Sequence, residues 1–255
     1  MNPEVLTSYQ WTLVALSFLI SVAGAFVALT AATRIQRKNT HSTFNILTAG
    51  MALGGVGVWA MHFVGMLALK LDVATSFSMI ETGISLAVAI LAASLALGFV
   101  ARAPDSLPRM MGAGLLLGTS VAFMHYLGMY GMKFGGFIQW NYGIVAISLV
   151  IAVVASTAAL WLAFNTASLA RRFAAAVVMA VAVCAMHYTG MAAAEFVCTT
   201  PARTALPQGF GYVSSFNLPS LVVMAAFTMV VLIALDQFLQ RSLVTRRPNT
   251  LKTRR

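Results

Sequence analysis

The chain has 255 residues, of which 60% are apolar and only 9% carry a charged side chain. Soluble globular domains are about a quarter charged, so this composition excludes an ordinary soluble domain. The formal net charge of +10 would indicate nucleic-acid binding if the basic residues formed one patch. They are instead divided among several loops, so we expect no nucleic-acid partner.

Seven apolar stretches are long enough to cross a bilayer as helices, which takes about 20 residues. In chain order they span residues 11–32, 44–69, 82–100, 110–132, 142–164, 173–197 and 218–238. We therefore predict an all-α membrane protein with seven transmembrane helices. Residues 1–240 are expected to form one membrane domain, and residues 241–255 a short basic tail.

The basic residues are distributed unequally between the two sides of this predicted topology. If the first helix begins outside the cell, thirteen of the sixteen fall inside: Arg34, Arg37, Lys38, Arg102, Arg109, Arg171, Arg172, Arg241, Arg246, Arg247, Lys252, Arg254 and Arg255. Lys70, Lys133 and Arg203 fall outside. Because basic loops stay in the cytoplasm, we predict an outer N-terminus and a cytoplasmic C-terminus.

The first apolar stretch is too long for the core of a secretory signal, and no lysine or arginine precedes Arg34. We therefore expect a retained helix at the N-terminus. Cys184 and Cys198 would lie roughly 20 Å apart along a helical backbone, which is too far for a bond. No intrachain disulfide is expected.

A pattern of Met, His, an aromatic residue, any residue, Gly and Met occurs at the outer ends of the second, fourth and sixth predicted helices. The copies span residues 61–66, 124–129 and 186–191, and their histidines are 63 and 62 residues apart. This period holds two membrane-spanning helices with their loops. We predict three parallel two-helix repeats plus a closing helix, with the three histidines at one depth in the outer half of the membrane.

Other positions of the repeat support the same alignment. Eight residues after each histidine come Lys70, Lys133 and Glu195, which we expect where each helix meets the outer interface. Seven residues before each histidine come small residues that permit close helix packing or leave room for a ligand: Gly55, Gly118 and Ala180. We interpret the motif glycines as helix-packing residues.

The fourth histidine and the longest outer loop lie outside the motif copies. The fourth histidine, His41, lies in a basic inner loop, where we expect it to be solvated. Residues 198–217 form the longest outer loop, which is either a lid over the motif ends or a mobile connection.

Histidine inside a membrane indicates function by default, since an unpartnered imidazole is costly there. Methionine four residues later shares its helix face. Imidazole and thioether without carboxylate suit copper better than magnesium, calcium or manganese. Zinc is less favoured because only Cys184 offers a thiolate. The candidate metal ligands are His62, His125 and His187 with Met61, Met66, Met124, Met129, Met186 and Met191.

Two alternatives to a copper site remain open at this point. Methionines pack helix interfaces well without a metal, so the histidines could form a purely structural cluster. Haem held by two of the histidines is a less favoured cofactor. An enzyme is the least favoured class, because the sequence shows no nucleophile, paired carboxylates or nucleotide-binding loop.

The motif copies resemble those of the MHYT family of bacterial integral membrane sensors. The family is named after the sequence Met-His-Tyr-Thr, which occurs unaltered at residues 186–189. Phe63 replaces the motif tyrosine in the first copy, and Val64 and Leu127 replace its threonine. The resemblance implies a multi-pass protein of the bacterial inner membrane. It also implies copper bound by the nine motif His and Met residues, and a response to oxygen, carbon monoxide or nitric oxide.

Many members of that family continue into a cytoplasmic signalling domain, whereas this sequence ends at Arg255. The resemblance therefore implies a stand-alone member that signals through a separate cytoplasmic protein. The competing function is a membrane carrier or assembly factor for copper. Few methionines and no further histidine lie below the motifs, which weakens the carrier hypothesis.

Overall fold

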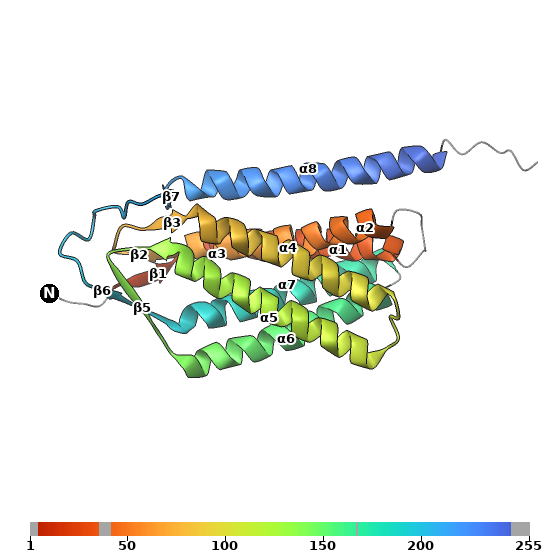
Figure 1. The fold of residues 1–255 in the computed structure, drawn as a ribbon, viewed down its shortest axis with the longest axis horizontal. Helices are drawn as coiled ribbons and strands as arrows, with labels where there is room; N and C mark the ends of the chain where they lie inside the picture. The colour runs from red at the N-terminus through yellow and green to blue at the C-terminus, as the bar shows by residue number, and fades with distance from the viewer. Residues whose placement is uncertain (1–4, 36–41, 167, 246–255) are drawn as a thin grey trace, which may run out of the picture.

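A computed structural model describes residues 5–35, 42–166 and 168–245. Within these residues, seven helical spans are long and apolar enough to cross a membrane, as the sequence predicts. The single-helix spans are α1 (Trp11–Ile35), α4 (Met79–Ala101), α5 (Leu107–Gly131), α6 (Tyr142–Asn165), α7 (Leu169–Ala192) and α8 (Leu218–Thr245). The second span, Thr43–Ala68, combines α2 (Ser42–Gly50), the π-helix η1 (Met51–Ala60) and α3 (Met61–Ala68). The protein is thus a multi-pass helical bundle (Figure 1).

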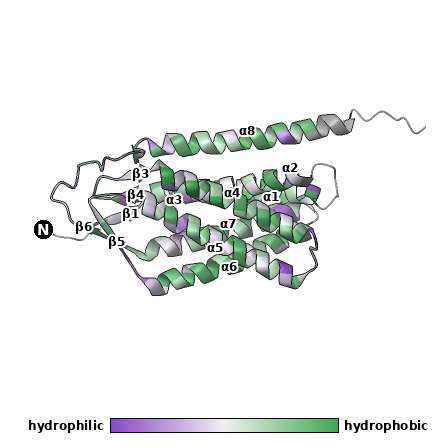
Figure 2. Cartoon of the chain, viewed as in Figure 1, coloured by the Kyte–Doolittle hydropathy of each residue, from purple (hydrophilic) through white to green (hydrophobic). Residues whose placement is uncertain are grey.

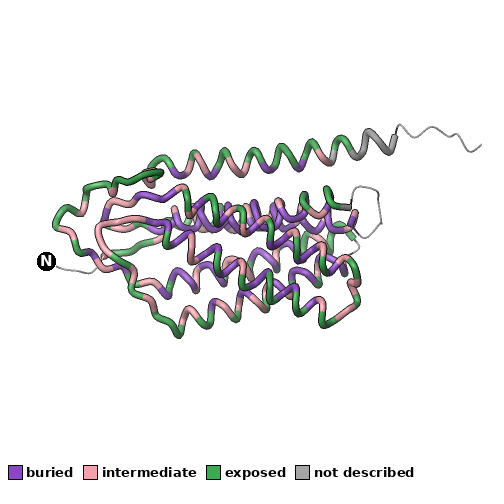
Figure 3. Tube along the Cα trace, in the orientation of Figure 1, coloured by how far each residue is buried: buried purple, intermediate pink, exposed green. Residues whose placement is uncertain are grey.

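The spans that carry the motif copies pack together, and other helices cover the grooves between them. α1 packs against α7 and the second span, α4 against the second span and α5, and α6 against α5 and α7. α8 lies outside this six-span bundle, against η1 and α3 (Figure 1). Figure 3 shows that buried positions concentrate inside the bundle, whereas α8 is exposed along much of its length.

Apolar side chains also cover the outside of the bundle. Large hydrophobic residues are exposed along the helices, among them Leu19, Leu95, Val154 and Phe227. Hydrophilic residues gather near the helix ends and in the loops (Figure 2). An apolar belt between polar ends is the surface that a bilayer requires.

The second span lies deepest in the protein. In its apolar window 89% of residues are buried, compared with 50% or fewer in every other span of the described chain. Glycines permit this enclosure because they let neighbouring backbones approach. A Cβ atom on Gly54 would overlap the backbone of Ala89 in α4, and one on Gly24 of α1 would overlap Gly57.

The prediction of one regular helix over residues 44–69 was wrong in its middle part, because residues 51–60 form the π-helix η1. Gly54, Gly55 and Gly57 lie in this segment, and glycine readily adopts unusual backbone geometry. Segments of π-helix are rare and occur frequently at functional sites. η1 ends directly before the first motif copy.

Short antiparallel strands close one end of the bundle, and the all-α prediction missed them. β1 (Thr7–Tyr9) pairs with β2 (Leu69–Leu71), and β5 (Gly136–Trp140) pairs with β6 (Ala194–Cys198). β3 (Ser76–Ser78) lies between β4 (Met132–Lys133) and β7 (Tyr212–Ser214). All lie at the N-terminal end of the bundle in Figure 1.

These strands end the motif helices earlier than predicted. The sixth helix was expected to reach residue 197, but α7 ends at Ala192 because residues 194–198 pair with β5. Lys70, Lys133 and Glu195 consequently lie in strands and not in the last helical turns. Each motif histidine is therefore five or six residues from its helix end, closer than the seven or eight predicted.

Hydrogen bonds tie the connection over residues 198–217 to the loop after β2 and to the first residue of α4. The Arg203 carbonyl accepts a hydrogen bond from the Ala74 amide at 2.7 Å, and the Gly211 carbonyl accepts one from the Met79 amide at 2.9 Å. The Arg203 guanidinium also pairs with Asp72. The role of this connection as a lid over the motif ends stays a prediction.

At the opposite end, α8 is attached to the second span. The Thr48 hydroxyl donates a hydrogen bond to the Asp236 carboxylate at 3.0 Å. α8 then continues to Thr245, past the predicted domain boundary at residue 240. His41 and residues 246–255 lie outside the described residues. Cys184 and Cys198 are free thiols in the structure.

Candidate metal centre

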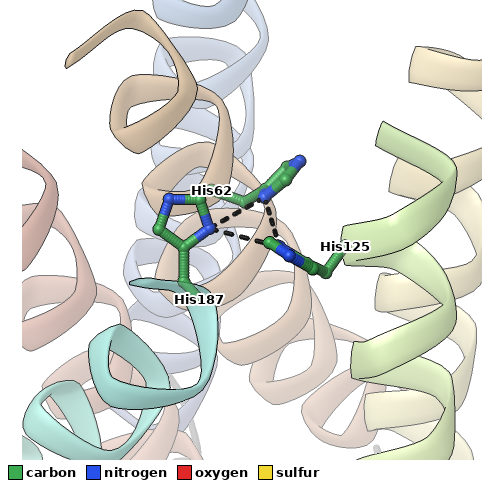
Figure 4. Close-up of side chains that lie close together, drawn as sticks. All are labelled: His62, His125 and His187. Atoms are coloured by element: carbon green, nitrogen blue, oxygen red, sulfur yellow. Dashed lines mark hydrogen bonds between the residues drawn. The ribbon is translucent and has the colours of Figure 1, made fainter. Parts of the chain in front are cut away.

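The three motif histidines converge in the interior of the bundle, between the motif helices and nearer the strand end. His62 projects from α3, His125 from α5 and His187 from α7, and each side chain is 1% exposed (Figure 4). Their Nδ1 atoms form a nearly equilateral triangle, with separations of 3.1 Å for His62–His187, 3.1 Å for His125–His62 and 3.2 Å for His187–His125. Residues more than sixty positions apart in the chain thus meet at one point.

The motif glycines hold the three rings in this orientation. The Nε2 edge of His187 rests on Gly65, that of His62 on Gly128, and that of His125 on Gly190. A Cβ atom at any of these glycines would overlap the Nε2 atom that it faces. Each copy therefore supplies one ring and also the seat for the ring of another copy. Their interpretation as helix-packing glycines was incomplete.

Hydrogen bonds among three Nδ1 atoms cannot all be satisfied. In a neutral imidazole each nitrogen is either a donor or an acceptor, and a hydrogen bond needs one of each. Donor and acceptor roles cannot alternate around a ring of three atoms, so at least one pair is mismatched. The three Nε2 atoms are also buried without a partner. A buried unsatisfied polar group costs about 1–3 kcal/mol, so the mismatched Nδ1 pair counts against an empty, purely structural cluster, whereas the Nε2 atoms lack a partner with or without a metal.

One cation resolves the mismatch at the three Nδ1 atoms. With the proton on Nε2, all three Nδ1 lone pairs face the centre of the triangle, about 1.8 Å from each nitrogen on the measured edges. That value is close to the metal–imidazole distance of about 2.0–2.1 Å known for zinc. The histidines form a group with metal-ligand spacing in the described part of the chain. The residues present therefore fit a single metal ion.

The six motif methionines are buried on the same three helices as the histidines. All are at most 3% exposed: Met61, Met66, Met124, Met129, Met186 and Met191. Met129 borders a hollow of about 500 Å³ on the strand side, and Met186 borders a small cavity on the opposite side. The nitrogen triangle is complete without sulfur, so thioether ligation by these residues stays a prediction.

Two other residues near the motifs are separate from the histidine group. Glu195 is exposed in β6, where it lies opposite Gln139. Cys184 is half-buried, three residues before His187. Neither belongs to the group of residues with metal-ligand spacing.

The aromatic residue after a motif histidine anchors its helix to a covering helix. The Tyr126 hydroxyl lies 2.6 Å from the Ser148 hydroxyl of α6, and the Tyr188 hydroxyl lies 3.0 Å from that of Ser17 in α1. Both serines donate to the carbonyl three residues earlier, so each accepts from its tyrosine. The tyrosine hydroxyls thus point away from the nitrogen triangle.

The first copy makes the same connection with a different residue. Phe63 has no hydroxyl, but the Trp59 indole, four residues before it, donates to the Ser85 hydroxyl of α4 at 3.0 Å. The Trp59 and Phe63 rings are in contact, with centroids 4.9 Å apart. Sequence analysis missed these serines. The sequence marks these serines only weakly, because serine is common in apolar helices. One usable sign is that Ser85 and Ser148 are separated by the repeat period of 63 residues.

Fold and site together define a multi-pass membrane protein built around a buried triple-histidine centre. The chain belongs to the MHYT family, described as the N-terminal repeat of bacterial signalling proteins, whose family model matches residues 1–43, 55–113 and 118–176. The second and third matches contain the copies with His62 and His125. The copy with His187 lies outside the matches, yet the structure brings it to the same centre.

Several bacterial signalling proteins are similar to this chain. The bifunctional diguanylate cyclase/cyclic di-GMP phosphodiesterase MucR of Pseudomonas aeruginosa is 36% identical over 197 residues, covering 75% of this chain and 29% of MucR. The cyclic di-GMP phosphodiesterase NbdA of the same organism is 33% identical, covering 78% and 26%. The signalling protein YkoW of Bacillus subtilis is 28% identical, covering 76% and 25%.

The chain spans between a quarter and three tenths of the length of these relatives. No solved structure matches it.

Proposed function

We propose that this protein is a membrane sensor domain that binds one copper ion at His62, His125 and His187 and responds to a diatomic gas or to redox state. The observation that carries this proposal is the triangle of Nδ1 atoms, which hydrogen bonds alone cannot satisfy. Membership in a bacterial signalling family supports the sensor role.

The donor set favours copper over other metals. Three neutral imidazoles in an apolar site with no carboxylate ligand suit a borderline or soft ion, and nearby thioethers favour reduced copper. When bound, copper would supply redox chemistry and an affinity for oxygen, carbon monoxide or nitric oxide. The chain itself buries the three imidazoles and orients their Nδ1 atoms toward one point.

We propose that the strand end of the bundle faces outward from the bacterial inner membrane, so that the C-terminus is cytoplasmic. The opposite end carries Arg34, Arg109, Arg171 and Arg172 in the first or last turns of their helices, and Arg102 directly after α4. Basic residues on one side favour a cytoplasmic location for that side. The helix contacts also support three repeats of a covering helix followed by a motif helix, with α8 as the closing helix.

A response at the centre has a direct structural connection to α8. α8 packs against η1 and α3, and α3 carries His62. The similar proteins MucR and NbdA are named for cyclic di-GMP synthesis or hydrolysis. We therefore expect the signal to leave along α8 toward a cytoplasmic signalling protein or domain, with no enzymatic activity in residues 5–245.

The alternative, a copper carrier, has less support. A carrier needs a series of further ligands on the inner side of the centre. The cavity there is lined by Val58, Val121 and Val183 and other apolar side chains, with Met179 and Met186 as its two thioethers, which is a sparse path for a copper ion.

Spectroscopy of metal-loaded protein tests the sensor function. Protein purified from its native membrane should contain copper, and carbon monoxide added under reducing conditions should give a copper-carbonyl infrared band. His125→Ala protein should lack both signals. A haem absorption spectrum, or copper that binds neither carbon monoxide nor nitric oxide and does not change oxidation state, would contradict the proposal.

A further inference from the structure

A small cavity lies on the inner side of the triple-histidine centre. It measures about 30 Å³, and residues of η1, α5, α6 and α7 line it. Its lining is almost entirely aliphatic or thioether, with Ser156 of α6 as the exception. The cavity is therefore apolar and lies within the membrane-spanning part of the bundle.

Along the motif helices, the cavity lies about one turn before the three histidines, which do not themselves line it. Val58, Val121 and Val183, which all line it, each precede a motif histidine by four residues. Residues four apart share a face of a helix, one turn from each other. The three motif helices thus place a valine below each histidine, and Met186, the neighbour of His187, lines the cavity between these two levels.

Size and polarity restrict what this space can hold. A cavity of about 30 Å³ exceeds the roughly 10–15 Å³ that one water molecule needs, but it has no room for an organic ligand. Water needs two to four polar partners, and dry apolar cavities instead take up apolar guests such as xenon. An ion or polar molecule would lose its hydration without replacement.

The wall of the cavity toward α6 consists of small side chains. Ala152, Ala155 and Ala159 recur there at helical spacing, and Ala155 is only half-buried. An apolar molecule that dissolves in the bilayer therefore needs no aqueous channel to reach this wall. The arrangement differs from the strand-side hollow, which has the charged residue Lys133 in its lining.

We propose that this valine-lined cavity is a binding site for one uncharged molecule of two or three heavy atoms, held immediately next to the triple-histidine centre. One part of this inference rests on the proposed function: a gas molecule in the cavity would move from there to the metal. Occupancy of the cavity itself does not depend on a metal.

Xenon tests the cavity without any metal. In crystals of the full chain under xenon pressure, we expect one xenon atom between Val58, Val121 and Val183. The Val121→Phe substitution should remove it by filling the space, whereas Val150→Phe, at a lipid-facing position of α6, should not. Val121→Leu offers a milder filling if the phenylalanine variant fails to fold. Absence of xenon from the wild-type cavity, or its persistence in both filled variants, would overturn the proposal.

Carbon monoxide tests the link to the centre. In copper-loaded protein, Val121→Phe or Val121→Leu should slow carbon monoxide association at least tenfold with unchanged copper content. An unchanged rate in a variant that has lost the xenon atom would overturn the assignment of the cavity as the position before the metal. If the wild-type protein holds no copper, the proposed function fails, while the xenon experiment still decides whether the cavity binds an apolar guest.

Discussion

The position of each imidazole depends on a residue with no side chain. The Nε2 edge of each ring lies against a glycine of another motif copy: Gly65, Gly128 or Gly190. Each histidine is therefore oriented by a helix other than its own. Local sequence cannot reveal this relation, because it arises only when the three helices are assembled. The spacing of histidines predicts that they converge, but not that Nδ1 faces inward.

The first prediction concerns one such glycine. Gly128→Ala should displace the His62 ring and lower copper affinity at least tenfold, because the added methyl overlaps Nε2. Gly112→Ala in the same helix is the control, since nothing lies within 4 Å of its Cβ position. Copper titration of both purified variants measures the difference. Equal affinities would show that the glycine does not set the ring position.

The tyrosine anchors support a second prediction at the residue scale. Tyr126→Phe removes the hydrogen bond to Ser148 and should lower stability by about 0.5–1.5 kcal/mol. Tyr142→Phe, at an exposed position in α6, is the control. Denaturant unfolding in detergent measures both. A loss of the same size in the control would mean that the anchor contributes nothing specific.

At the scale of elements, the second span departs furthest from a regular helix. It is the most enclosed span, contains the π-helix η1, and contacts α1, α4 and α8. The apolar stretch in the sequence predicts a helix there. Its π geometry depends on tertiary packing around three glycines, which hydrophobic periodicity does not report.

Adjacent glycines in η1 should respond differently to the same substitution. Gly54→Ala places a methyl against the backbone carbonyl of Ala89, which cannot move without shifting α4. Gly55→Ala meets the sulfur of Met229, the end of a flexible side chain that can rotate away. We expect Gly54→Ala to lose about 1–3 kcal/mol and Gly55→Ala much less. Thermal unfolding in detergent compares them, and equal losses would contradict the packing described for η1.

The short strands were missed for a related reason. They contain two to five residues each, and their partners are up to 138 residues away, as in the pairing of Ser76 with Ser214. Such short segments carry no reliable alternation of apolar and polar residues, so the sequence extends α7 into residues that pair with β5. Long, strongly apolar spans carry the signal that composition and length can predict.

At the scale of the whole molecule, the charge distribution predicts how the bundle sits in its membrane. A reporter that works only in the cytoplasm should be active when it is fused to the C-terminus. A reporter that works only outside the cytoplasm should be active when it is fused to the N-terminus. The structure places the histidine centre nearer the strand end, which this orientation puts outside. A periplasmic C-terminus would reverse the orientation and place the centre near the cytoplasmic face.

The central claim is that three histidines share one metal ion. Copper analysis of protein from the native membrane should give one ion per chain for the wild type. His62→Ala, His125→Ala and His187→Ala should each lose it to a similar extent while staying folded. Met66→Leu, Met129→Leu and Met191→Leu should lose less, because they keep packing volume and leave the nitrogen triangle complete. Histidine variants that keep full copper occupancy but lose helix packing would contradict a shared metal centre and establish a structural cluster in its place.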